Sequence, residues 1–322
     1  MNHLQRYLSS EFAEEYQEGH LSRRDALKMI ASVTGSLVLA NSILAACMPP
    51  PEETQTAGTE TDVPTNEPAS LEPDATISPT SASAPAYGTV MPDDPAVIAG
   101  EVEIPSDTPP LMGYLARPAS GESAPLVLVC HENRGLTAHI QDVTRRFAKA
   151  GYVSLAVDLA SRHGGSAAVG EGGVPGVLGS IDPDQFVADF TDGWRYLGTQ
   201  SFAQADRVGM VGFCFGGGVT WLMAARMPEL KAAVPFYGPP PPLDEVPNIQ
   251  APVLAVYGGQ DGRITGTISS IEPAMQENNK VYEKLIYPNA DHAFNNDTSS
   301  RYNPEAAKDA WAQTLAWFEK YL

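Results

Sequence analysis

Apolar runs of strand length alternate with segments of helical periodicity from residue 97 to the C-terminus, and this alternation constrains the fold more than any other feature. The continuous run APLVLVC is typical of a strand buried on both faces of a parallel sheet. The strand-like runs in chain order are VIAGEVEI, LMGYLARP, APLVLVC, YVSLAVDL, RVGMVGF, KAAVPFYG, APVLAVYGG and YEKLIYP, of which the first two look like a hairpin. The helical segments are expected around 138–150, 186–197, 215–227, 269–278 and 304–322. The sequence therefore predicts one α/β domain over residues 97–322, with a mostly parallel sheet, helices on both faces and no large cap domain.

The turn GFCFGGG places Cys214 between glycines, after the apolar run RVGMV and before a helical segment. Gly-x-Cys-x-Gly is the cysteine form of the nucleophile elbow, in which strand and helix approach so closely that neighbouring positions need to lack side chains. The N–H groups at the start of the following helix favour the thiolate, which is the reactive form. We therefore predict Cys214 as a nucleophile. The alternative is an inert cysteine in the core.

A nucleophile elbow needs an acid and then a histidine further along the chain. Asp261 in YGGQDG and His292 in NADHAF each follow a predicted strand, in the required order. His292 would exchange a proton with the thiol, and Asp261 would orient its ring. Asp291 is the alternative to Asp261 in that role. Backbone N–H groups of Phe215 and Asn133 are the candidates for the oxyanion hole.

Five motifs together resemble the dienelactone hydrolase family, the α/β-hydrolases with a cysteine nucleophile. They are CHENRG, DLASR, GFCFGGG, the GGQD turn, and DHAF followed by RYNPEAAKDAW. The resemblance covers residues 97–322. It implies the α/β-hydrolase fold, a triad of Cys214, Asp261 and His292, and cleavage of an ester or lactone through a thioester without a cofactor.

The same resemblance implies roles for two further loop residues. Glu132 in CHENRG matches an active-site glutamate that helps to switch the thiolate on, although a salt bridge to Arg134 or Arg162 is the alternative. Arg162 in DLASR matches an arginine that anchors the substrate's carboxylate, although it could be an ordinary solvated arginine. The chain departs from the family pattern at Asn296, where the best-known members carry a second arginine. Arg301 is the other candidate for that contact.

The N-terminal segment resembles an export signal. SRRDALK, residues 22–28, resembles a twin-arginine motif, and the uncharged stretch that follows ends in Leu-Ala-Ala-Cys, which resembles a bacterial lipobox. We therefore predict a signal peptide over 1–46, lipidation of Cys47, and an acidic, disordered tether rich in Pro, Thr and Ser over 47–96. These features predict an exported bacterial lipoprotein anchored on the extracytoplasmic side of a bilayer. An uncleaved single-pass helix is the alternative.

Composition excludes some partners. The 322 residues hold 39 acids and 20 bases, a net charge of -19, so no basic surface is expected for nucleic acid. The histidines and cysteines show no metal-ligand spacing, and we predict no metal. A disulfide between Cys130 and Cys214 is the alternative to free thiols. Other functions left open are a broad carboxylesterase or acyl hydrolase acting on envelope compounds, and an inactive surface module that binds a small molecule or a partner.

Overall fold

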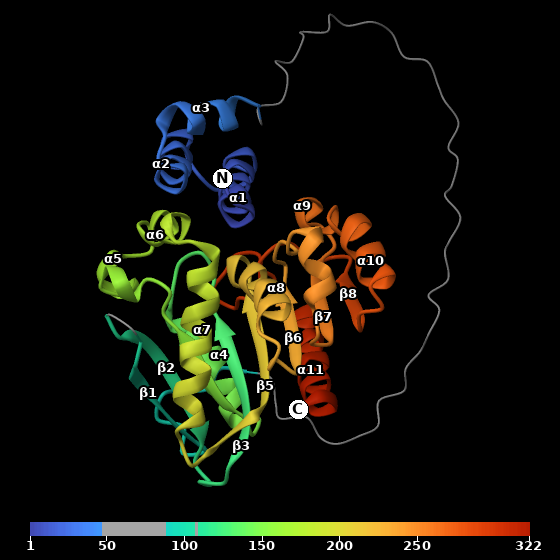
Figure 1. Cartoon of the computed structure of the whole chain (residues 1–322). Helices are drawn as coiled ribbons and strands as arrows, with labels where there is room; N and C mark the ends of the chain where they lie inside the picture. The colour runs from blue at the N-terminus through green and yellow to red at the C-terminus, as the bar shows by residue number, and fades with distance from the viewer. Residues whose placement is uncertain (47–87, 107–108) are drawn as a thin grey trace, which may run out of the picture.

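The computed structural model describes residues 1–46, 88–106 and 109–322, and places eight strands in one sheet (Figure 1). The strand order is β1-β2-β4-β3-β5-β6-β7-β8. β2 pairs antiparallel with β1 and β4, and the other pairings are parallel. The strands are β1 (Val97–Ile104), β2 (Leu111–Pro118), β3 (Ala124–Cys130), β4 (Val153–Val157), β5 (Ala203–Phe213), β6 (Ala232–Phe236), β7 (Val253–Gly258) and β8 (Tyr282–Tyr287). The prediction of a mostly parallel α/β sheet is confirmed.

Helices cover both faces of the sheet. Phe186 of α7 stacks edge-on against Phe215 of α8 on one face, and Phe147 of α4 packs on Trp311 of α11 on the other. The five predicted helices are α4 (Ala138–Lys149), α7 (Pro183–Gly198), α8 (Phe215–Arg226), α10 (Ile268–Glu277) and α11 (Pro304–Tyr321). The prediction did not include the short helices α5 (Ser166–Val169), α6 (Val174–Ser180) and α9 (Gly262–Thr265), or the 3-10 turns η1 (Ser161–His163) and η2 (Leu243–Asn248).

Three N-terminal helices lie over the carboxyl ends of the parallel strands β3, β5 and β7 (Figure 1). They are α1 (His3–Gln17), α2 (Arg23–Thr34) and α3 (Leu37–Ala46). Leu4, Leu8 and Phe12 of α1 are buried, and Val33 of α2 packs directly on Gly179 of α6. This small helical cover precedes the α/β domain in the chain and is not an insertion between two strands.

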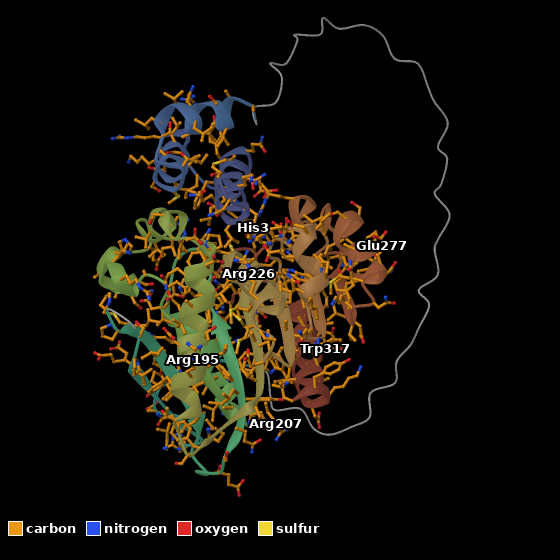
Figure 2. The ribbon with its side chains drawn as sticks, in the orientation of Figure 1. His3, Arg195, Arg207, Arg226, Glu277 and Trp317 are labelled. Atoms are coloured by element: carbon orange, nitrogen blue, oxygen red, sulfur yellow. The ribbon has the colours of Figure 1, made fainter. Side chains whose placement is uncertain are left out.

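The start of α1 is in contact with the end of α8. His3 and Arg226 lie at the junction between the cover and the domain (Figure 2). Burial lowers the pKa of His3 to about 4, opposed by the nearby carboxylate of Glu245. The half-buried, neutral imidazole indicates that this end of α1 is packed against the domain.

The uncharged stretch that follows SRRDALK, residues 29–46, belongs to two separate helices rather than to one long helix. The break is at Gly35, whose φ of 68° is a left-handed conformation that ends α2. Within residues 1–46, 88–106 and 109–322, no helix is long and apolar enough to cross a bilayer.

The folded domain begins earlier than the predicted boundary at 97. Residues 88–96, assigned above to the tether, are in contact with α4: the Val90 N–H donates to Asp142 Oδ1 at 2.7 Å, and its C=O accepts from Arg145 Nε at 2.5 Å. Val90 is also buried. The rest of the predicted tether, 47–87, and the lipidation site Cys47 lie outside the described residues.

Candidate active site

The turn between β5 and α8 holds Cys214 in a strained conformation. Its φ of 57° and ψ of -119° are rare for a residue with a side chain. A Cβ at Gly212 would lie 2.1 Å from the Gly216 carbonyl oxygen, and one at Gly216 would lie 2.5 Å from that of Cys130. The glycines are therefore required for β5, β3 and α8 to approach, as the elbow motif predicts.

His292 and Asp261 reach the elbow from the loops after β8 and β7. The His292 Nδ1–H donates to Asp261 Oδ2 at 2.6 Å, while Oδ1 of the same carboxylate accepts the Ile264 N–H at the start of α9. A ring nitrogen of His292 lies within 4.8 Å of the Cys214 Sγ. Asp291 instead accepts the backbone N–H of His292 at 2.6 Å. The geometry thus brings Cys214, Asp261 and His292 together, with the other imidazole nitrogen, Nε2, on the cysteine side.

Glu132 lies two residues after the end of β3 and is 8% exposed. Its Oε2 accepts from Asn296 Nδ2 at 2.8 Å, and its Oε1 has no hydrogen-bond partner among the described residues. Burial raises the pKa of this carboxyl, against the lowering effect of His139 and His292. The residue at the family's arginine position, Asn296, is therefore the partner of Glu132.

The two predicted substrate arginines are engaged by carboxylates of this chain. Arg162 Nη1 donates to both oxygens of Asp189, each at 2.7 Å, and Asp189 is fully buried. Arg301 donates to Glu18 Oε2 at 2.8 Å, and its Nε lies 3.6 Å from Asp291. Both guanidinium groups therefore have carboxylate partners within this chain.

The two oxyanion candidates come from different parts of the chain, Phe215 directly after the nucleophile and Asn133 in the loop after β3. Phe215 is the first residue of α8, so its N–H is one of those without a partner inside the helix. Asn133 follows Glu132 and is buried. Cys130 and Cys214 are both free thiols, so the alternative of a disulfide between them is wrong.

Two residues of α1 are in contact with Cys214 and His292, and sequence reasoning missed them. The Tyr7 hydroxyl donates to Cys214 Sγ at 3.1 Å and lies 3.5 Å from His292 Nε2. Glu11 Oε1 lies 3.3 Å from the same Nε2. Apolar residues at Leu4, Leu8, Phe12 and Tyr16 recur every four positions, which is the pattern that could have indicated a docked helix.

These contacts set the charge state of the site. Although burial would lower the pKa of His292, the charge of Glu11 and the hydrogen bond to Asp261 raise it well above the ordinary value. Burial raises the pKa of the Cys214 thiol, and the carboxylate of Glu11 raises it further against the effect of His292. The arrangement with α1 in place is therefore an imidazolium paired with Glu11 beside a protonated thiol.

Glu11, Cys214 and His292 are also a possible ligand set for a metal, because one donor atom from each lies within 4.8 Å of the others. A thiol and an imidazole that exchange a proton require the same proximity. Proton exchange accounts for the cluster without an ion.

Comparison with known proteins identifies a family. The model of the dienelactone hydrolase family matches residues 111–322. A Methylorubrum extorquens protein named "Putative carboxymethylenebutenolidase" is 36% identical over 249 residues, which cover 73% of this chain and 86% of that protein. A Bradyrhizobium protein named "Probable 2-oxo-3-(5-oxofuran-2-ylidene)propanoate lactonase" is 33% identical over 233 residues, covering 69% of this chain and 94% of that protein.

A solved structure agrees with these matches. The crystal structure of a Klebsiella pneumoniae protein, titled a "Putative Dienelactone Hydrolase", superposes with a TM-score of 0.65 at 36% identity. It covers 70% of this chain and 100% of its own. The α/β-hydrolase fold is therefore shared over the catalytic domain.

Proposed function

Because the chain belongs to the dienelactone hydrolase family and is a carboxymethylenebutenolidase-like hydrolase, we propose that it cleaves an ester or lactone through a Cys214–His292–Asp261 triad. One observation carries the proposal: an imidazole fixed by Asp261 at 2.6 Å stands beside a thiol held at a strained strand-to-helix turn. This arrangement suits transfer of a proton between sulfur and ring.

The reaction has two halves. The Cys214 thiolate attacks the carbonyl carbon, the C–O bond breaks, and the His292 imidazolium gives its proton to the leaving alkoxide. His292 then takes a proton from water, and the resulting hydroxide attacks the thioester and releases the acid and the thiolate. In a lactone the alkoxide stays attached to the acyl chain. Backbone N–H groups of Phe215 and Asn133 are the donors for the oxyanion, each contributing about 3 kcal/mol in comparable sites.

Glu132 supports activation of the thiol. Its burial favours the neutral acid, and Asn296 holds one of its oxygens while the other has no hydrogen-bond partner within the described part of the chain. The proposed role is proton exchange with sulfur when substrate arrives. The candidate anchors for a substrate carboxylate are Arg162 and Arg301. Each would first have to release its own carboxylate partner, Asp189 or Glu18, so neither is assigned a contact with the substrate.

Lactone rather than open-chain ester is the favoured substrate class, because the Bradyrhizobium relative is named a lactonase. The expected result is a Cys214 acyl adduct when residues 88–322 are mixed with activated esters and lactones and quenched in acid. Intact-protein mass spectrometry would detect the added acyl mass, and peptide mapping would place it. An acylated serine or lysine, with Cys214 unmodified throughout the panel, would contradict the thioester. Binding without turnover would favour an inactive surface module.

The proposed location is the extracytoplasmic face of a bacterial membrane, with Cys47 lipidated. The supporting features are the paired arginines in SRRDALK and the Leu-Ala-Ala-Cys sequence. Cells fed labelled palmitate should label the wild-type protein and not the Cys47→Ser variant. Labelling of both proteins, or of neither, would contradict an anchor at this residue.

A further inference from the structure

We infer that residues 1–46 hold this hydrolase in a latent form, with helix α1 occupying the space in which the substrate's carbonyl group must lie. The inference rests on the proposed function of Cys214 and His292. It assigns a regulatory role to a segment for which the sequence predicts only an export signal.

Tyr7 blocks the nucleophile sterically. Its hydroxyl oxygen is 3.1 Å from Cys214 Sγ. A carbonyl carbon would need a similar position, since reacting atoms approach to about 3–3.5 Å before bond formation. With α1 docked, Cys214 is 4% exposed and His292 is 5% exposed. A substrate therefore cannot reach the sulfur until Tyr7 leaves.

Glu11 blocks the proton transfer. The Nδ1 of His292 is bound by Asp261, so Nε2 is the nitrogen left for exchange with the thiol. Glu11 Oε1 lies 3.3 Å from that nitrogen and stabilises the imidazolium, which cannot accept a proton. The same carboxylate raises the pKa of the Cys214 thiol, in addition to the effect of burial. Departure of α1 would remove both effects at once.

The docked helix is acidic, and the surface that receives it is basic. Arg263 pairs with both Glu11 and Glu14, and lies 4.6 Å over the Tyr7 ring. Further contacts join Glu15 to Arg134, Glu18 to Arg301, and Gln5 Nε2 to the Gly179 carbonyl. The Glu11 carboxylate, held between an arginine and the catalytic imidazole, thus stands in for an anionic group of a substrate.

Removal of the predicted signal would also remove the block. The Leu-Ala-Ala-Cys sequence places cleavage before Cys47, and α1, α2 and α3 all end by Ala46. Once the chain is cut, the cover is no longer held at the high effective concentration that a covalent link provides. The twin-arginine route exports proteins already folded. The latent precursor would thus be carried across the membrane before it becomes active.

The test compares unprocessed and uncovered protein. The full chain carrying Cys47→Ser is the unprocessed form, and residues 88–322 are the uncovered form. The uncovered form is expected to fold alone, because the Klebsiella structure is matched over 100% of its chain by 70% of this one and the family model begins at residue 111. Two rates are measured: hydrolysis of an activated ester, and alkylation of Cys214 by iodoacetamide followed by peptide mapping.

We expect both rates to be about 100-fold lower in the full chain, since only the uncovered fraction of molecules is competent. In the full chain, Tyr7→Ala and Glu11→Gln should each raise both rates about tenfold by shifting that equilibrium. Glu14→Gln is the matched control. It changes a glutamate of the same helix that is bound to the same arginine, whereas the contact with His292 is made by Glu11. Its rates should rise by much less than those of Glu11→Gln.

The outcomes separate this inference from the proposed function. Equal alkylation rates in covered and uncovered protein would overturn latency, even if both forms hydrolyse esters. A lower hydrolysis rate in folded Tyr7→Ala or Glu11→Gln would overturn it too, by making α1 part of the working site. Faster alkylation of Cys214 without α1, in a protein that hydrolyses no ester, would support the cover and remove the proposed reaction. If residues 88–322 fail to fold, the full-chain variants decide.

Discussion

Replacing Cys214 by alanine in residues 88–322 is expected to lower kcat for ester hydrolysis by roughly 10⁴-fold or more, because loss of the nucleophile removes the covalent route. What remains would come from the oxyanion donors and binding alone. KM should change little, because the thiol contributes to the transition state more than to ground-state binding. The measurement is steady-state hydrolysis of an activated ester, with thermal unfolding to verify the fold.

Cys130→Ala is the matched control for this variant. Cys130 is a second free, fully buried thiol at the end of β3, whose pKa is raised by burial and by Cys214. This substitution also removes one buried sulfur, so Tm should fall through loss of packing, while kcat stays close to that of the parent. A kcat for Cys214→Ala within tenfold of the parent would mean that another group attacks the substrate.

The fold was predictable because its central strands are short, continuously apolar runs. All six residues of β7 are buried, as are all five of β4 and β6, and runs of this length between turn residues identify strands although they show no alternation. The short helices α5, α6 and α9 were missed because segments of four to seven residues hold too few turns to show a helical period. The boundary near Val90 was missed because one buried valine in a polar stretch has no pattern.

The site was predictable where chain order carries information. In this fold the elbow, the acid and the histidine follow fixed strands, so Asp261 and His292 could be named from their position after strand-like runs. Side chains that reach the site from distant helices could not be predicted in this way. Asp189 of α7, which binds Arg162, and Tyr7 of α1, which binds the thiol, are ordinary helix residues until the fold brings them to the loops.

The N-terminal cover was missed for a different physical reason. The same N-terminal segment can be an export signal and can also dock on the domain, because one apolar helical face can serve both purposes. Glu11, Glu14, Glu15 and Glu18 are the residues that pair with the domain's arginines or with His292. Their complement is Arg134, Arg263 and Arg301, which lie in two loops and the short helix α9, and only the folded sheet brings these three segments together.

Asp261→Asn in residues 88–322 is expected to lower kcat by about 10⁴-fold, as does loss of the orienting carboxylate in other triads. The amide can donate a hydrogen bond to Nδ1, which would leave the proton on Nε2 and prevent that nitrogen from accepting one from the thiol. Asp261 also raises the pKa of His292, so the imidazolium should titrate at lower pH in the variant. The pH profile of alkylation at Cys214 measures this shift.

A matching substitution at Asp291 tests whether Asp261 or Asp291 orients His292. Asp291→Asn keeps an oxygen that can accept the His292 backbone N–H, now received at 2.6 Å, and leaves the 2.6 Å bond from Nδ1 to Asp261 in place. Its kcat should therefore stay within a few-fold of the parent, since the amide oxygen of asparagine can accept this hydrogen bond in place of the carboxylate oxygen. A larger loss in Asp291→Asn than in Asp261→Asn would assign the orienting role to Asp291. The hydrogen bond on Nδ1 would then be a feature of the latent form, made while Glu11 holds the ring from its other side.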